Sequence, residues 1–123
     1  MKCIRMYADP EGESHFEDVE IEFGDIAVAG SVEPWGLSEP IPVTSATFLR
    51  RSAAAATIGW HNAPRRQFVI RLEGDVDIEV SDGEVRHLGP GSVLLAEDTT
   101  GKGHRGVGAS EDGVAIVLPF QEQ

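Results

Sequence analysis

The sequence predicts an all-β domain, and three observations support this prediction. Short segments alternate apolar and polar side chains, as strands with one buried face do. Turn residues, above all glycine, separate these segments at regular intervals. No stretch has the longer period of an amphipathic helix, and Ser52–Thr57 is too short to be stable as an isolated helix. Many short strands joined by glycine turns indicate a sandwich or a barrel.

Strand signals are weaker in the first part of the chain. Val19–Phe23 and Ile26–Val28 are expected to be strands, and Thr47–Leu49 is expected to open another. Pro34-Trp35-Gly36 and Pro40-Ile41-Pro42 are expected in loops, because proline has no N–H for a sheet ladder.

The clearest strands lie in the second half. Val76–Val80 alternates valine and isoleucine with acidic residues, which predicts a strand with a buried face and an acidic outer face. Asp82-Gly83 follows and supplies the positive φ angles of a tight hairpin turn. Phe68–Leu72 is apolar on both faces and is expected to be covered on both sides. The other expected elements are the strands Val85–Leu88, Val93–Ala96 and Val114–Leu118, the turns Gly89-Pro90-Gly91 and Ser110–Gly113, and the loop Glu97–Gly103.

Composition and charge exclude several classes of protein. The chain has 123 residues, about the length of one domain, and its 41% of hydrophobic residues is too high for a disordered chain. The formal net charge of −11 argues against nucleic acid or an anionic membrane as a partner, because both select basic surfaces. The single cysteine excludes an internal disulfide. Because the sequence also lacks an apolar membrane span and a signal-peptide pattern, a soluble cytoplasmic protein is expected.

The charges are unevenly distributed along the chain. Residues 6–49 contain acids but no lysine or arginine, whereas residues 40–72 contain arginines but no acid. The simpler interpretation is that acidic and basic strands pair across a sheet. The alternative is a positively charged pocket for an anionic ligand inside an otherwise acidic protein.

Two of the histidines, His61 and His104, are candidate catalytic residues. If the stretch after His61 is extended, every second residue shares one face, so His61 and Gln67 point the same way. Pro64 fits an edge or a bend and weakens this parity. His104 ends a glycine-rich loop. The strands between His61 and this loop form hairpins, so the chain can turn back and place the loop beside the strand of His61. Histidine titrates near neutral pH, which suits general acid–base catalysis.

These residues resemble the two linked motifs of the cupin superfamily. The matching positions are Gly59, His61, Gln67, Gly74, Gly89-Pro90-Gly91, Gly101 and His104. The segments Ala-Pro-Arg-Arg-Gln-Phe and Glu-Asp-Thr-Thr-Gly-Lys-Gly-His are also similar to those of small single-domain bacterial cupins. The resemblance implies a double-stranded β-helix, or jelly-roll, barrel in a single cupin domain over residues 1–123. Residues 1–50 would form N-terminal strands and loops, and residues 51–118 the barrel core.

The resemblance also implies one divalent metal ion, such as Zn, Fe, Mn or Ni, inside the barrel. Metal-binding cupins use histidines and a glutamate as ligands. Here His61 and His104 match two of the histidines, Gln67 stands at the glutamate position, and Ala63 replaces another histidine. The expected metal ligands are therefore His61, Gln67 and His104. A firm zinc site has about four ligands, so this set is degenerate, and water, a substrate oxygen or Asn62 could complete it.

Four further residues are expected to bind the ligand: Arg65, Arg71, Asn62 and Trp60. The planar guanidinium of arginine binds carboxylate or phosphate through two parallel hydrogen bonds. Trp60, like Trp35, is more typical of a core or an interface than of a platform that stacks on a ligand.

Other polar residues have structural interpretations. His15 and His87 are expected at the surface or in turns. Glu97–Thr100 is expected to be a solvated loop, with a carboxylate lid over the barrel mouth as the alternative. Gln67 fits an amide that bridges strands as well as it fits a metal ligand.

Three functions are consistent with the sequence, and it does not decide whether the protein is an enzyme. The first is a metal-dependent cupin enzyme. The second is a metal-free enzyme similar to sugar-nucleotide isomerases and epimerases, and the third is a non-catalytic module that binds a small ligand. The expected partners are a small, anionic molecule and a second copy of the chain in a homodimer. Two-fold symmetry is the commonest closed symmetry, and the segment Lys2–Tyr7 is expected to pair across that interface.

Overall fold

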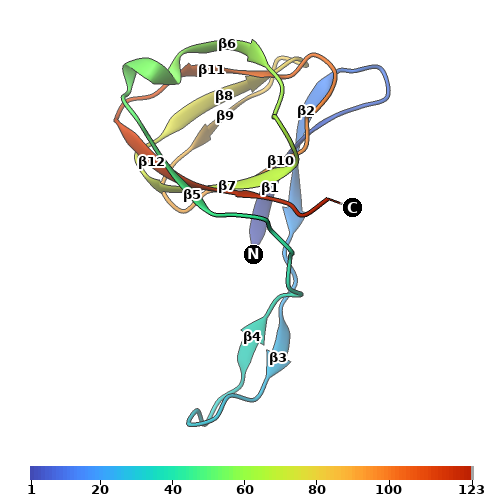
Figure 1. Ribbon diagram of the computed structural model, residues 1–123, viewed down its shortest axis with the longest axis vertical. Helices are drawn as coiled ribbons and strands as arrows, with labels where there is room; N and C mark the ends of the chain where they lie inside the picture. Colours follow the sequence, from blue (N-terminus) through green and yellow to red (C-terminus); the bar gives the residue numbers. More distant parts are fainter. Residues whose placement is uncertain (123) are drawn as a thin grey trace.

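The computed structural model describes residues 1–122 and confirms the all-β prediction (Figure 1). Within these residues the strands build three separate sheets and no closed barrel, and the helical structure is limited to one turn, η1 (Ala54–Ala56). None of this part of the chain forms a helix long and apolar enough to cross a membrane. The strands are β1 (Lys2–Ala8), β2 (Ser14–Glu20), β3 (Gly24–Ile26), β4 (Trp35–Leu37), β5 (Thr47–Arg51), β6 (Ile58–His61), β7 (Gln67–Glu73), β8 (Val76–Val80), β9 (Val85–Leu88), β10 (Val93–Ala96), β11 (His104–Gly108) and β12 (Gly113–Pro119).

The largest sheet has six strands in the order β2-β1-β10-β7-β12-β5. β1 pairs with β2 on one side and with β10 on the other, so the segment Lys2–Tyr7 has no free edge for a second copy. On β7 the side chains alternate, and Gln67, Val69 and Arg71 line the interior of the molecule. Leu72, on the other face, is 44% exposed, so the expected cover on both sides of this strand is incomplete.

The second sheet has four strands in the order β6-β11-β8-β9. β8 and β9 form the predicted hairpin, and Gly83 at its turn has a φ of +97°, which glycine adopts without steric cost. β8 also shows the predicted alternation, with Val76, Ile78 and Val80 buried. The predicted strands Val85–Leu88 and Val93–Ala96 coincide with β9 and β10, and the predicted Val114–Leu118 is slightly longer as β12.

The two large sheets face each other and share one core (Figure 1). Met6, Leu94 and Ala96 reach this core from the six-stranded sheet, and Ile78 and Val80 reach it from the four-stranded sheet. Burying a side chain as large as valine, leucine, isoleucine or methionine contributes roughly 1.5–3 kcal/mol. The sheets are held in place by this core and by the loops between them.

The predictions for the first half need correction. The strand expected at Val19–Phe23 is β2, which ends at Glu20, and the strand expected at Ile26–Val28 is β3, which ends at Ile26. Trp35, expected in a loop, lies in β4. Pro34 precedes β4, where its missing N–H interrupts no ladder. β3 and β4 form a two-stranded ribbon within residues 22–43, which we call the arm, and it projects away from both large sheets (Figure 1).

Candidate functional site

A cavity of about 360 Å³ lies between the two large sheets. Its wall is mainly apolar, and apart from Ser92 its polar side chains form two groups, one with His61, Gln67 and His104 and the other with Arg51 and Arg71. We call these groups the histidine end and the arginine end. Gln67 and Arg71 are four residues apart on β7, which corresponds to roughly 13 Å at about 3.3 Å per residue. The volume lies in the range of sites for small organic molecules.

The histidine end forms where β6 and β11 pair. His104 lies opposite His61 in this antiparallel pair, and the two ring centroids are 4.3 Å apart at an angle of 57°. Gly103 has a φ of +75°, and a side chain there would collide with the backbone carbonyl of His61. The close approach of the two strands therefore requires glycine at this position. His104 is largely buried whereas His61 is exposed, so the cavity opens to solvent beside His61.

Asp98 fixes the orientation of His104. One of its carboxylate oxygens, Oδ2, lies 2.5 Å from Nδ1 of His104, and its side chain is fully buried. The other oxygen, Oδ1, is buried without a hydrogen-bond partner in the described residues. The Asp98 carbonyl also accepts hydrogen bonds from the Ala63 N–H and the Asn62 side chain. This loop was expected to be solvated, and for Asp98 that expectation is wrong.

The hydrogen bonds define which ring nitrogens remain for a ligand. Nδ1 of His61 lies 2.8 Å from the carbonyl oxygen of Gly59, which can only accept, so this nitrogen donates. An ionised Asp98 likewise accepts from Nδ1 of His104. No hydrogen bond within residues 1–122 uses Nε2 of either ring. The pair therefore retains two nitrogens that can accept or donate a proton.

The donor set at this end does not fit a tightly held divalent metal. It contains two imidazoles and the neutral amide of Gln67, while Ala63 is buried in the wall and offers no donor. No three His, Cys, Asp or Glu side chains of residues 1–122 converge so as to hold an ion. The donor set is short of the four ligands of a structural zinc site, and it reaches the three protein ligands of a catalytic one only if the neutral amide of Gln67 is counted. The cofactor remains a prediction that metal analysis tests.

The remaining predicted ligand residues lie apart, except for Arg71. Arg65 is exposed and outside the cavity lining, because the chain bends at residues 64–66 and breaks the expected parity. Trp60 is 46% exposed, and its ring lies 5.2 Å from the Arg105 guanidinium on the protein surface. Asn62 holds the loop through its hydrogen bonds to the carbonyls of Asp98 and Gly101.

The arginine end combines a predicted residue with one that the sequence did not single out. Arg71 lines the cavity from β7, and Arg51 does so from β5. Burial lowers the pKa of Arg71, and the positive charge of Arg51 lowers it further, while Asp75 opposes these effects. Arg51 was not selected because no motif marks it. It faces the cavity because it alternates with the outward-facing Arg50 on β5.

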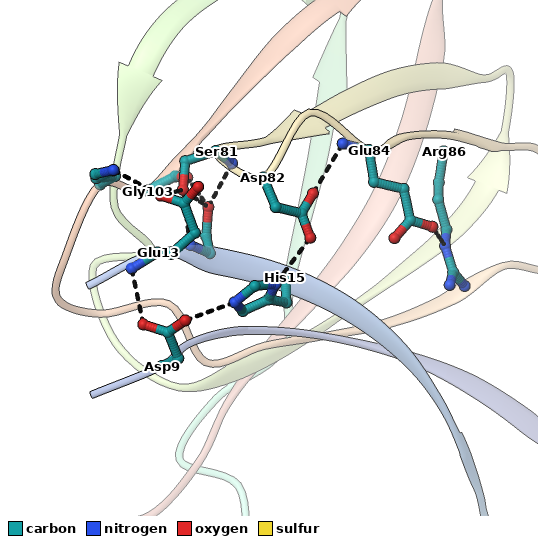
Figure 2. Close-up of polar contacts among 10 residues, drawn as sticks. Asp9, Glu13, His15, Ser81, Asp82, Glu84, Arg86 and Gly103 are labelled. Atoms are coloured by element: carbon teal, nitrogen blue, oxygen red, sulfur yellow. Dashed lines mark hydrogen bonds and ion pairs between the residues drawn. The ribbon is translucent and has the colours of Figure 1, made fainter. Parts of the chain in front are cut away.

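His15 and His87 lie outside the cavity, as expected. His15 bridges two carboxylates, with Nε2 2.7 Å from Asp9 and Nδ1 2.8 Å from Asp82 (Figure 2). These hydrogen bonds, the one to Asp9 first, raise the pKa of His15. His87 lies on β9, opposite Asp77 on β8.

No protein-family model matches the chain, and the comparison with curated proteins gives no match. The cupin resemblance therefore remains a prediction from the motif positions.

Proposed function

We propose that the cavity binds a small organic molecule and that His104, oriented by Asp98, transfers a proton to or from it. The observation that supports this proposal is the buried Asp98–His104 contact beside His61 on the wall of a mainly apolar cavity. A histidine whose Nδ1 is fixed by a carboxylate presents Nε2 in one defined protonation state, as a general base requires. We also propose that the two facing sheets are a cupin-type jelly roll.

The reaction follows from these groups. Nε2 of His104 removes a proton from the bound molecule at a carbon made acidic by an adjacent carbonyl group. The resulting imidazolium is stabilised by Asp98, and the low polarity of the wall strengthens this interaction. In isomerisation the proton is delivered to the neighbouring carbonyl carbon while the hydroxyl proton passes to the other oxygen; in epimerisation a proton reaches the opposite face of the same carbon. Neither reaction changes the net protonation of the substrate. His61 lies beside His104, at the open side of the cavity, and can exchange the proton with water.

The experiment measures deuterium incorporation by NMR. The protein is incubated in heavy water with a panel of small keto acids and sugar nucleotides, and exchange next to the carbonyl is followed. His104→Gln should lower the exchange rate by about 10²–10⁴-fold, the usual contribution of a general acid–base group. His15→Gln is the matched control, because it makes the same chemical change outside the cavity, and it should retain the wild-type rate.

Two outcomes would contradict this function. An exchange rate in His104→Gln equal to that of the wild type would exclude His104 as the base. If no compound exchanges but one of them raises the melting temperature, the protein is a binding module instead.

Metal analysis distinguishes the metal-dependent alternative. Protein purified without added metal is assayed before and after incubation with Fe²⁺, Mn²⁺, Ni²⁺ and Zn²⁺. About one ion per chain, lost in both His61→Gln and His104→Gln, would favour the metal enzyme over metal-free proton transfer.

A further inference from the structure

The two arginines at the arginine end of the cavity make no ion pair within residues 1–122. Nε of Arg71 is buried and has no hydrogen-bond partner in the described part of the chain. The two guanidinium groups lie close together beside Gly113. A methyl group added there would lie 3.0 Å from Nη1 of Arg71 and 3.3 Å from Nη2 of Arg51. Leaving a charged donor buried and unpaired is costly, so this arrangement is expected where a ligand completes it.

Asp75 acts on Arg71 electrostatically but makes no ion pair with either arginine. The carboxylate of Asp75 accepts hydrogen bonds from the Ser110 N–H and hydroxyl and from the Glu111 N–H. Arg51 donates to the backbone carbonyls of Asp75, Ser52 and Glu111, and none of its hydrogen bonds in the described residues goes to a carboxylate. No salt bridge within residues 1–122 involves Arg71. The donors of Arg71 that face the cavity are therefore available to an anion.

We propose that Arg71 and Arg51 form a subsite for the carboxylate or phosphate group of a ligand whose apolar part fills the middle of the cavity. Binding of an anion at this subsite does not depend on the proposed function. Only the identification of the bound anion as the substrate rests on that function. The two ends of the cavity are separated by about four residues of β7. A ligand whose anionic group binds the arginines must therefore extend roughly 10–13 Å to bring its reactive atoms to the histidines. The substrate class is thus an elongated anionic carbonyl compound.

The test measures binding, so its outcome does not depend on catalysis. Octanoate, its neutral counterpart 1-octanol, and inorganic phosphate are titrated into wild-type protein, Arg71→Met and Arg65→Met. Arg65 is the matched control, since it is an exposed arginine outside the cavity lining. Octanoate or phosphate should raise the melting temperature of the wild type and of Arg65→Met, and Arg71→Met should weaken anion binding at least about tenfold.

A response to phosphate alone identifies a phosphate-sized anion, and a response to octanoate alone identifies a carboxylate with an apolar tail. Without ligand, Arg71→Met should melt no lower than the wild type, because it removes a partly buried guanidinium that makes no ion pair in the described residues. Equal anion affinity of the wild type and Arg71→Met would overturn the subsite. So would a wild-type melting temperature that neither anion changes at millimolar concentration.

An independent observation concerns the arm, residues 22–43. Ile26 pairs with Trp35 across the ribbon, and Leu37 follows Trp35 on the same face. These three side chains are 42%, 57% and 56% exposed. β3 and β4 pair only with each other in the described residues, and an isolated two-stranded hairpin is at best marginally stable in water. The apolar face of the ribbon is therefore unpaired in the described residues and is available to a partner surface.

The outer face of the six-stranded sheet has matching properties. Phe48 on β5 is 69% exposed there, and Arg50 beside it makes no ion pair within residues 1–122. A hollow of about 300 Å³ lies between the base of the arm and this face, with Ile41 on one side and Ile70 on the other. The arm has acidic residues and no lysine or arginine, so its charge complements Arg50.

We infer that the arm clasps a second copy of this chain. The apolar face of each ribbon covers the outer sheet face of the partner near Phe48, and the acids of the arm approach Arg50. The arrangement is isologous, as in most two-fold dimers. The arm is about as long as the roughly 20–30 residues per side of a standard interface. Because β1 is paired on both edges, this assigns the dimer contact to the arm rather than to Lys2–Tyr7.

Sedimentation velocity tests the dimer at micromolar concentration. The wild type should have the mass of a dimer, and the double variant Trp35→Asp/Leu37→Asp should have that of a monomer. Phe48→Asp tests the receiving face and should give the same loss. Val85→Asp is the control, because Val85 is 50% exposed but lies on β9 of the other sheet.

Circular dichroism of each variant shows whether the sheets remain folded. A monomeric wild type would overturn the inference, and the arm would then be a candidate binding surface for a different protein. A double variant that is folded and still dimeric would overturn it as well.

Discussion

His15 and His104 each lie against aspartate, but the two sites differ in how many ring nitrogens are occupied. His15 has Asp9 on one nitrogen and Asp82 on the other, at 2.7 and 2.8 Å (Figure 2). His104 has Asp98 on Nδ1 alone, and its other side faces His61 and the cavity. Both sites resemble a catalytic pair, but only His104 has a nitrogen that a substrate can reach. The occupancy of the second nitrogen thus distinguishes a structural histidine from a candidate catalytic one.

The aspartates that contact the two histidines also differ in burial. The carboxylates at His15 come from the β1–β2 and β8–β9 turns, so the three side chains connect loops at the surface. Asp98 is fully buried, and its loop is held by the N–H of Ala63 and the amide of Asn62. The buried contact holds one ring in place, whereas the surface contact stabilises the position of two turns.

The largest effect that sharpens this comparison is expected from Asp98→Asn. The amide can donate to Nδ1 and would favour the tautomer in which Nε2 carries the proton, so His104 could no longer act as the base. The deuterium exchange rate should fall by about 10⁴-fold, as for the same change in a serine-protease triad, with little change in ligand affinity. Calorimetry with the exchanging compound and the pH profile of kcat separate this positioning role from a structural one. A rate within twofold of the wild type would leave Asp98 a purely structural residue.

The sequence could predict local structure but not this site. Val76–Val80 and the Asp82-Gly83 turn were predictable because alternation and turn chemistry are local properties. Asp98 was missed because its role depends on a loop that returns beside β11, and a polar loop sequence alone does not show that one of its carboxylates is buried. The predictions for Arg65 and Arg51 were wrong in opposite ways. Arg65 was expected in the site, but a bend at Pro64 turns it outward; Arg51 was not selected, but the alternation of β5 turns it inward.

His15→Gln should have a smaller effect, on stability, that depends on pH. The folded state raises the pKa of His15, so its contribution is fully present below the ordinary histidine pKa of about 6.5 and is lost as the pH rises through the folded value. Only the imidazolium donates to Asp9 and Asp82 at once. The variant should melt a few degrees below the wild type near pH 5.5 and match it near pH 9, as calorimetry at the two values would show.

Asp9 provides the control for that prediction. Its pKa is lowered, chiefly by the hydrogen bond with His15, so its favourable contribution is lost only when the pH falls well below 5. Asp9→Asn should therefore reproduce the pH-dependent loss of His15→Gln, and the double variant should add little to either. A melting difference that grows from pH 5.5 to pH 9 would show that the site acts through packing rather than charge.

The smallest effect is expected from His87→Gln, and it tests whether contact with an aspartate is sufficient for a histidine to matter. Nδ1 of His87 lies 2.7 Å from Asp77, but the His87 side chain is 62% exposed and that of Asp77 is 44% exposed. Exposed pairs of this kind contribute little because water screens them and ordering the side chains costs entropy. Urea unfolding should therefore show a change of no more than about 0.5 kcal/mol, at pH 5.5 as at pH 9. A larger loss of unfolding free energy that depends on pH would show that His87 contributes to stability as His15 does. Burial of a histidine–aspartate pair would then not predict how strongly the pair stabilises this protein.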